Sequence, residues 1–419
     1  MKSASGLLVL WVTCLLLPAL SFGWQEPIYD ILLKGGHVID PRNERDGVFD
    51  VAIADGKIAR MGRNIPEAGS RRVVDVAGLY VTPGLIDIHT HVYTGTGRRG
   101  AYNGDNSVYP DGFTFRCGVT TVVDVGGSGW RDFEDFKDRV IDRSKTRVLA
   151  MLNIVGYGMS GGPIEQNTLD MEPEPTAAMA RKYPRTIVGI KTAHYAAPDW
   201  TAVDRALEAG NLADLPVMVD FGKFMEVRPF ERLVSEKLRP GDIYTHAYLR
   251  WVPMFDAAGK VRDYLFQAQK RGVIFDVGHG GGSFSFRMAA PATQQGFWPN
   301  SISTDLHIGS MNSGMKNQLN VMSKFLNLGM SLTDVIKAST WNPAQEIRRE
   351  GLGHLSEGAV ADVAVLALHQ GQFGFLDIEG GRMDGTQKLE CELTLKDGQV
   401  QYDLNARAAD HWTVTPHRP

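Results

Sequence analysis

The sequence predicts an α/β fold: a (β/α)8 barrel of the TIM type with a small β-sandwich formed by both chain ends. Three observations predict it. Apolar, strand-like runs alternate with helical runs over residues 83–350. This segment is close in length to the ~250 residues of a typical barrel. Short strands separated by turn residues lie on either side of it. We therefore assign residues 83–350 to the barrel, and 24–82 together with 351–419 to the β-sandwich.

The two flanking segments have the same alternation of short apolar runs and turn signals. The N-terminal one contains three or four short strands, separated at Gly35–Gly36, Asp55–Gly56 and Ala77–Gly78. The C-terminal one has strands within 362–368 and 392–404, with a hairpin turn at Asp397–Gly398. Two such segments around a barrel predict one β domain built from both ends.

The central segment contains the barrel strands as nearly continuous apolar runs. After the first strand, these runs lie at 119–126, 147–156, 186–191, 215–222, 242–246, 272–281 and 301–305. Helical spacers separate several of them, at 132–143, 199–210 and 261–272. Apolar strands that alternate with helices indicate a parallel sheet covered by helices.

The first barrel strand lies in PGLIDIHTHV, residues 83–92, and ends in two histidines. Side chains at positions i and i+2 of a strand share one face, so His89 and His91 project to the same side. An exposed strand end with two unrelated histidines is one interpretation. The other is half of a metal site, whose remaining ligands must come from elsewhere in the chain.

Polar residues at the ends of the other apolar runs have the spacing that a barrel mouth requires. Barrel active sites form at the C-terminal ends of the strands. From Lys191 onward these residues lie about 30 residues apart, the length of one β/α unit, and the step from His89 to Lys191 fits three units. The set predicted to converge on one mouth is His89, His91, Lys191, Asp220, His246, His279 and Asp305.

Each of these residues also has a purely structural interpretation. Lys191 could extend its amine from a strand end to water. Asp220 and Asp305 could cap the helices that follow them. His246 and His279 could be hydrogen-bonded core histidines. Their joint placement at the spacing of one β/α unit favours a metal site.

Composition and charge exclude some classes of function. The chain is 43% hydrophobic, which is enough to bury a large core. Its net charge of −4 provides no basic surface for nucleic acid or an anionic membrane, so we expect a small-molecule substrate. Cys117 and Cys391 show no disulfide-framework spacing and are predicted to be buried free thiols. The oligomeric state is left open.

The N-terminus has the pattern of a secretory signal peptide. Lys2 precedes an apolar run from Leu7 to Leu20, and small residues follow it. The run is short for a membrane span, and Pro18 interrupts it, so a signal peptide over residues 1–23 is favoured over a membrane anchor. The mature protein is expected to be exported, to the periplasm or the extracellular space.

The motifs together resemble the amidohydrolase superfamily, and within it the dihydroorotase- and D-aminoacylase-like branch of deacetylases. The resemblance covers about residues 30–405. It rests on PGLIDIHTH, GVTTVVDVG, IVGIK, THAYLR, FDVGHGGGSFSF, ISTDLH, STWNPA and LGHLSEGAVADVAVL.

This resemblance implies a binuclear site for two divalent metal ions, with Zn²⁺ the expected metal. Lys191 would be carboxylated, and its carbamate would bridge both ions. The first ion would be held by His89, His91, Lys191 and Asp305, and the second by Lys191 and His246. Imidazole and carboxylate groups are suitable ligands for zinc.

Asp220 departs from the family pattern, which has a histidine at the end of strand 5. A carboxylate can ligate zinc through oxygen, but it ends nearer the backbone than the far nitrogen of an imidazole. A shifted alignment is disfavoured by the regular spacing around Asp220. We therefore expect Asp220 to be a ligand of the second metal, in preference to a weakened or empty second site.

The resemblance also implies the chemistry. Two metal ions would activate a water and polarise the scissile carbonyl. Asp305 would act as general base and then as general acid. His279 is expected to contact the substrate, and His194 and His307 are further candidates to touch the site.

The predicted substrate is an acyl or acetyl derivative of an amino or hydroxy acid, joined by a non-peptide amide or an ester bond. Dihydroorotase-like members have an arginine two residues after the second histidine, where this chain has Tyr93. A cyclic pyrimidine precursor is therefore disfavoured, and a cyclic amide hydrolase of the dihydroorotase or hydantoinase kind is kept as an alternative. A catalytically inactive barrel that only binds a ligand is a second alternative, from another functional class.

Overall fold

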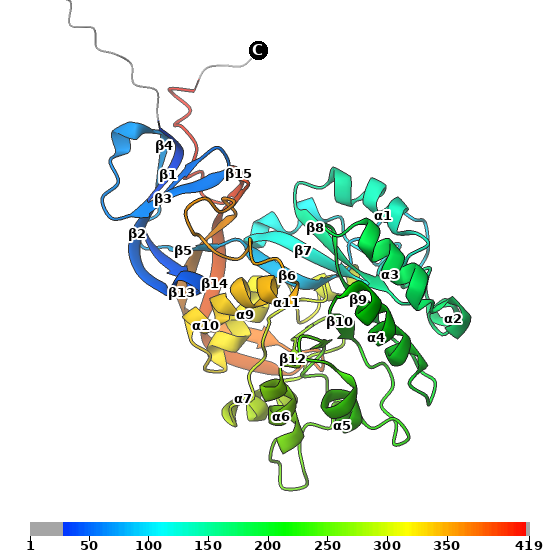
Figure 1. Cartoon of the computed structure of the whole chain (residues 1–419). Coiled ribbons are helices and arrows are strands. Elements are labelled where there is room, and N and C mark those ends of the chain that lie inside the picture. Colours follow the sequence, from blue (N-terminus) through cyan, green and yellow to red (C-terminus); the bar gives the residue numbers. More distant parts are fainter. Residues whose placement is uncertain (1–27, 416–419) are drawn as a thin grey trace, which may run out of the picture.

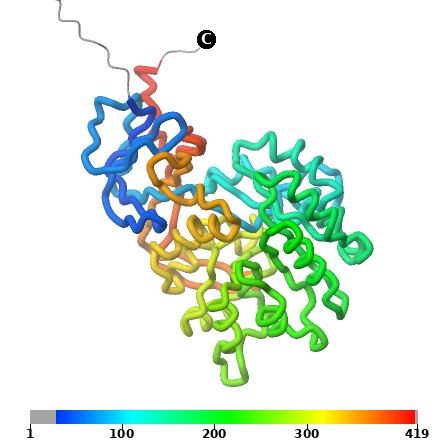
Figure 2. The backbone as a smooth tube through the Cα atoms, in the orientation of Figure 1, coloured from blue at the N-terminus to red at the C-terminus, as the bar shows by residue number. Residues whose placement is uncertain are grey.

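The computed structural model describes residues 28–415, so the predicted signal peptide lies outside the described residues. The chain forms a barrel and a β domain that lie side by side (Figure 1). Figure 2 shows the blue N-terminal segment next to the orange-red C-terminal segment, so both ends of the described chain build the β domain. This arrangement confirms the predicted fold class.

The barrel sheet is parallel, and its seven strands follow one another in sequence order. They are β6 (Leu85–Thr90), β7 (Val119–Val125), β8 (Arg147–Asn153), β9 (Ile187–Thr192), β10 (Val217–Val219), β11 (Ile243–Tyr244) and β12 (Ile274–Phe275). The eighth position is taken by residues 301–306. Ser301 forms a parallel bridge with Asp276 beyond β12, and Leu306 forms one with Thr90 of β6, which closes the ring.

The last strands are much shorter than the sequence predicts, because the backbone turns away from the ladder at the site. β10 has three residues, and β11 and β12 have two each. His246 has φ +63° and Gly278 has φ +45°, values outside the range of a regular strand. The polar residues therefore follow these strands on loops instead of ending them.

Helices cover the outside of the barrel. They are α1 (Phe133–Arg139), α3 (Pro173–Lys182), α4 (Thr201–Ala213), α6 (Asp263–Arg271), α7 (Phe286–Gln294), α9 (Gln318–Asn327), α10 (Leu332–Lys337) and α11 (Trp341–Glu346), with short turns α2 (Gly162–Glu165), α5 (Phe230–Arg232) and α8 (Ile308–Met311). In α4, the residues buried against the sheet recur with helical spacing, at Ala202, Val203, Ala206 and Ala209.

Two hydrophobic clusters form the packed core of the barrel. The larger one lies between the strands and the surrounding helices. The smaller one fills the barrel interior with side chains from alternate strand positions, such as Ile86, Val123 and Met151, and includes Ile347 just after α11. The interior is thus packed, so a ligand can reach only the loops at the barrel mouth.

The β domain is one mixed sheet of eight strands with a shared core. Its strands are β1 (Tyr29–Asp40), β2 (Arg45–Ala54), β3 (Lys57–Gly62), β4 (Ser70–Asp75), β5 (Tyr80–Pro83), β13 (Val363–Leu376), β14 (Arg382–Lys396) and β15 (Gln399–Asp403). One interpretation was wrong: Gly35–Gly36 lies inside β1 instead of between strands. The pairing of β1 with β2 shifts register between Leu33 and Gly36, so the glycines form a bulge.

The hairpin of β13 and β14 is longer than the sequence indicates, and it extends from the β domain along the barrel (Figure 1). Asn327 of α9 bonds the backbone of Thr386 and Gln387. At the tip, Asp377 accepts a hydrogen bond from the amide of Phe286, where α7 begins. The hairpin therefore braces the segment just after the Gly280–Gly282 loop.

Two further expectations concern cysteines and membrane spans. Cys117 and Cys391 are free and buried, as predicted. Across residues 28–415, the structure contains no helix with the length and apolar character needed to cross a bilayer.

Candidate metal centre

The strand-end residues come together around one cavity of about 460 Å³ at the barrel mouth. All six predicted metal ligands line it: His89, His91, Lys191, Asp220, His246 and Asp305. His194 and His307, the two further candidates, line it as well, together with Tyr102, Met159 and the Gly281–Ser283 loop.

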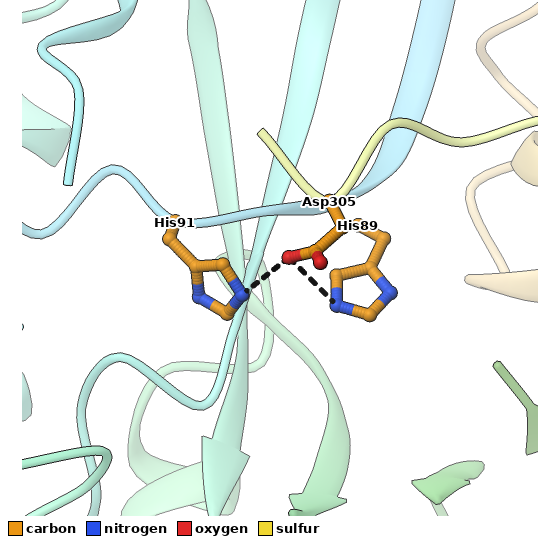
Figure 3. Close-up of side chains that lie close together, drawn as sticks. All are labelled: His89, His91 and Asp305. Atoms are coloured by element: carbon orange, nitrogen blue, oxygen red, sulfur yellow. Dashed lines mark ion pairs between the residues drawn. The ribbon is translucent and has the colours of Figure 1, made fainter. Parts of the chain in front are cut away.

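The first ligand group consists of His89, His91 and Asp305, all buried (Figure 3). Oδ1 of Asp305 lies 3.0 Å from Nε2 of His91 and 3.6 Å from Nε2 of His89. One ligand atom from each residue lies within 4.8 Å of the other two. Two imidazole nitrogens and a carboxylate oxygen converging in this way fit a divalent cation such as zinc.

A buried hydrogen-bond chain fixes the ring of His89. Its Nδ1 lies 2.7 Å from Oγ1 of Thr245, whose hydroxyl donates to Asp276 at 2.8 Å. Ser301 and Ser303 donate to the same carboxylate. Metal-bound histidines are usually held through the second nitrogen in this manner, which leaves Nε2 free for the ligand.

Thr245→Val should weaken metal binding by about 10- to 100-fold, because it removes the hydroxyl that orients His89 while keeping the shape of the side chain. The dissociation constant can be measured by competition with a metal-binding dye. Thr120→Val is the matched control, since the Thr120 hydroxyl is also buried but has no hydrogen-bond partner among the described residues. Equal dissociation constants for the two variants would contradict this role of Thr245.

Lys191 lies in the cavity wall with its amine unpaired. Its side chain is 1% exposed, and Nζ has no hydrogen-bond partner among the described residues. Burial lowers the pKa of Lys191, against the opposing effect of Asp220 and Asp305. Gly126 makes room for it, because a Cβ there would come within 2.8 Å of Cγ of Lys191. A buried amine without a partner fits the predicted carbamate.

A second group of possible ligands lies beside the first in the same cavity. Oδ2 of Asp220 lies 3.3 Å from Nε2 of His194 and 3.7 Å from Nε2 of His246. Nδ1 of His246 is 2.7 Å from the carbonyl oxygen of Gly278, so this ring is also fixed through its second nitrogen. The rings of His246 and His89 are 5.0 Å apart, which brings the two groups next to each other.

Three cavity residues have left-handed backbone conformations, which side chains other than glycine rarely adopt. Their φ angles are +58° for His194, +63° for His246 and +51° for Asp305. Such strain costs roughly 1–3 kcal/mol per residue and is concentrated at functional sites. The chain therefore maintains strained backbone at these three side chains.

Electrostatics keep the acids of the site ionised. Burial disfavours the charged form of Asp305, but the hydrogen bond and charge of His91 outweigh it, so the pKa of Asp305 is lowered. Burial of Asp220 is likewise outweighed by His246 and His194, and its pKa is lowered. Burial keeps the pKa of His89 well below its ordinary value, which leaves a neutral imidazole suited to metal binding.

No sequence-family model matches the chain, but individual relatives do. A deacetylase from Brucella anthropi is 31% identical over 347 residues, which cover 80% of this chain and 83% of the relative. A deacetylase from Agrobacterium fabrum is 31% identical over 337 residues, with coverage of 78% and 80%. The chain belongs to the amidohydrolase superfamily. It lies in the dihydroorotase and deacetylase branch and is a hydrolytic enzyme acting on carbon–nitrogen bonds.

Solved structures of other amidohydrolases have the same fold. A crystal structure described as an adenine deaminase superposes with a TM-score of 0.80 at 26% identity, covering 90% of this chain and all of that one. A dihydroorotase structure gives a TM-score of 0.75 at 28% identity, covering 88% and 98%.

The structure does not bring His279 into the cavity of this amidohydrolase. His279 is fully buried, its ring stacks on Phe284 with centroids 4.5 Å apart, and its Nε2 lies 2.7 Å from Nζ of Lys324. Its neighbours Gly281 and Gly282 line the cavity instead. The predicted contact of His279 with substrate therefore has no support in this geometry.

Sequence reasoning missed several residues of the site. Asp276, which supports His89 through Thr245, had a usable signal, because an acid within the apolar run GVIFDVG must be buried and paired. Tyr102, whose ring centroid lies 4.5 Å from that of His91, comes from a long loop, and Glu165, which bonds His194, ends the short helical turn α2. Neither segment has a periodic pattern. Nothing in the sequence marked them.

Proposed function

We propose that this amidohydrolase is a binuclear, metal-dependent deacylase. It would cleave an acetyl or acyl group from an amino- or hydroxy-acid derivative, at a non-peptide amide or ester bond. The observation that supports this most is the convergence of His89, His91 and Asp305 within 4.8 Å, beside the unpaired amine of Lys191. The curated relatives named deacetylase support the acyl specificity.

In this proposal, His89, His91, Asp305 and carboxylated Lys191 hold one divalent cation, and Lys191, Asp220 and His246 hold another. The cations polarise the scissile carbonyl and make water acidic when they are bound. The ionised carboxylate of Asp305 accepts the proton of the attacking water and later donates it to the leaving group. His89 and His246 remain fixed by their Nδ1 contacts, so the ligand set keeps its geometry through the cycle.

The surroundings of Tyr93 argue against a cyclic pyrimidine precursor. Tyr93 is buried, and its hydroxyl donates to Asp135 at 2.6 Å, away from the cavity wall. Among the described residues that line the cavity, there is no arginine to grip a substrate carboxylate in the dihydroorotase manner. A cyclic amide hydrolase and an inactive binding barrel remain the alternatives to be tested.

A substrate panel tests the proposed activity. Protein purified without chelator should hydrolyse at least one member of a panel of N-acyl and O-acyl amino and hydroxy acids. Activity should disappear on removal of metal and return on addition of Zn²⁺. Hydrolysis of dihydropyrimidines or hydantoins alone would favour the cyclic amide alternative. Full metal loading with no hydrolysis of any acyl or cyclic amide would favour the binding barrel.

We also propose that the enzyme is exported, on the basis of the predicted leader. Cleavage is expected between residues 19 and 24, because small residues follow the apolar run there. Mass spectrometry of the protein from its native host should show a chain that lacks this segment. A full-length chain recovered from the cytosol would contradict export.

A further inference from the structure

His194 takes part in an arrangement that is similar to the one around Asp305 but wider. Oδ1 of Asp305 lies between two Nε2 atoms, at 3.0 Å from His91 and 3.6 Å from His89. Oδ2 of Asp220 also lies near two Nε2 atoms, at 3.3 Å from His194 and 3.7 Å from His246. The three ligand atoms of this second group do not all lie within 4.8 Å of one another, as those of the first group do. Each carboxylate oxygen is thus accompanied by two imidazole nitrogens that can share a cation with it.

The ring of His194 is oriented like that of a metal ligand. Its Nδ1 lies 2.7 Å from Oε2 of Glu165, a buried carboxylate, so Nε2 is the nitrogen that faces Asp220 and the cavity. A carboxylate behind a histidine that faces a cation raises the basicity of the imidazole and fixes its direction. Gln166 adds a second restraint, because its side-chain amide donates to the carbonyl of His194 at 2.9 Å.

The backbone at His194 has an unusual conformation that two other proposed ligands share. His194 has φ +58°, close to the values for His246 and Asp305. Gly222, two residues after Asp220, packs directly against it, and a Cβ on Gly222 would lie 3.0 Å from the carbonyl carbon of His194. The loops that follow β9 and β10 are therefore fitted to each other, and they carry His194 and Asp220 respectively.

We infer that His194 is a ligand of the second divalent cation, together with Asp220, His246 and carboxylated Lys191. The imidazole that the family resemblance places at the end of strand 5 is supplied here by the loop after strand 4. The carboxylate of Asp220 stands at the strand 5 position. This inference rests on the proposed binuclear hydrolase and assigns one more residue to its metal site.

The alternative is an ion pair. A protonated His194 held between Glu165 and Asp220 would have the same contacts and would bind no metal. The two cases differ in metal content, so stoichiometry separates them without any need for a substrate.

The test measures zinc per folded chain by inductively coupled plasma mass spectrometry, after purification without chelator and removal of free metal. We expect about two ions in the wild-type protein, one in His194→Ala and two in the matched control His307→Ala. His307 lines the same cavity but forms no ion pair with Asp220. In the double variant His194→Ala/Asp220→His, the imidazole is restored on strand 5, and the count should return to two.

Anomalous diffraction from wild-type crystals at the zinc edge provides a measurement that does not depend on any variant folding. A peak within bonding distance of His194 Nε2 and Asp220 is the expected result. Two ions retained in His194→Ala, or a second peak that excludes His194, would overturn the inference and leave the proposed function intact. A single wild-type ion at His89 and His91 would also overturn it. No metal in the wild type would contradict the proposed function itself.

Discussion

Asp305→Asn should lower kcat by about 100- to 10,000-fold, because an amide cannot accept the proton that the attacking water must lose. The side chain keeps its size, and its oxygen can still face His91, 3.0 Å away in the native protein. Steady-state kinetics on the best substrate of the acyl panel measures the loss. The defect should appear in kcat, because the proton is transferred in the chemical step and not in binding.

Metal content serves as the control for this variant. Asp305→Asn should retain most of the second cation, because Asp305 is not among the proposed ligands of that cation. A variant that keeps its metals and also most of its activity would show that Asp305 is not the base. A variant that loses all metal would leave its own kinetics uninformative, and Asp305→Glu, which keeps the carboxylate, would then be compared with the wild type at matched metal content.

Lys191→Met should abolish activity, to below about one-thousandth of the wild-type rate, and should reduce the metal content. Its buried amine lies in the wall of the cavity that both ligand groups line, and a thioether cannot form a carbamate. The linear methionine fills the same volume beside Gly126, so the barrel is expected to fold. Metal analysis and the acyl panel measure both effects.

Lys324→Met provides the matched control, since Lys324 is likewise a fully buried lysine. Its amine already has partners, His279 and the carbonyl of Gly314, and it lies outside the cavity lining. Folded Lys324→Met protein should therefore keep both ions. If Lys191→Met retained two ions and normal activity, the bridging role of Lys191 would be wrong.

The sequence predicts the barrel best where an apolar run and its turn coincide. The runs at 119–126 and 186–191 match β7 and β9 to within one residue at each end. The prediction is poorer at the C-terminal ends of β11 and β12, because His246 and Gly278 adopt positive φ angles that hydrophobic periodicity does not reveal. Strain of this kind is specified by tertiary packing around the site.

The ligand set is predictable because its residues recur at the length of one β/α unit. The residues that hold the ligands in place by hydrogen bonds are harder to predict from sequence spacing. Thr245 directly precedes a predicted ligand, yet its partner Asp276 belongs to the next unit, and Glu165 ends the short helical turn α2 in the segment between β8 and β9. These contacts join segments that are distant in sequence, so spacing alone does not reveal them. The same limit applies to His279, which has the right spacing but turns toward Lys324.

In the β domain, the prediction of strands from the sequence fails for a different reason. Its core positions follow the alternation of apolar residues, but residues 369–376 and 382–391 were not recognised as strand. In β13 this extension is mostly exposed, with polar residues such as Gln370 and glycines such as Gly374, a composition typical of loops. Pairing with β14 and the bonds of Asn327 to the hairpin keep it extended.

The central claim is that His89, His91 and Asp305 hold a catalytic metal ion. Anomalous diffraction from crystals of the wild-type enzyme, purified without chelator and measured on both sides of the zinc edge, tests it most directly. We expect a strong peak within bonding distance of Nε2 of His89, Nε2 of His91 and a carboxylate oxygen of Asp305. Crystals of active enzyme with no peak at these three side chains, at this edge or at those of the other first-row transition metals, would contradict it.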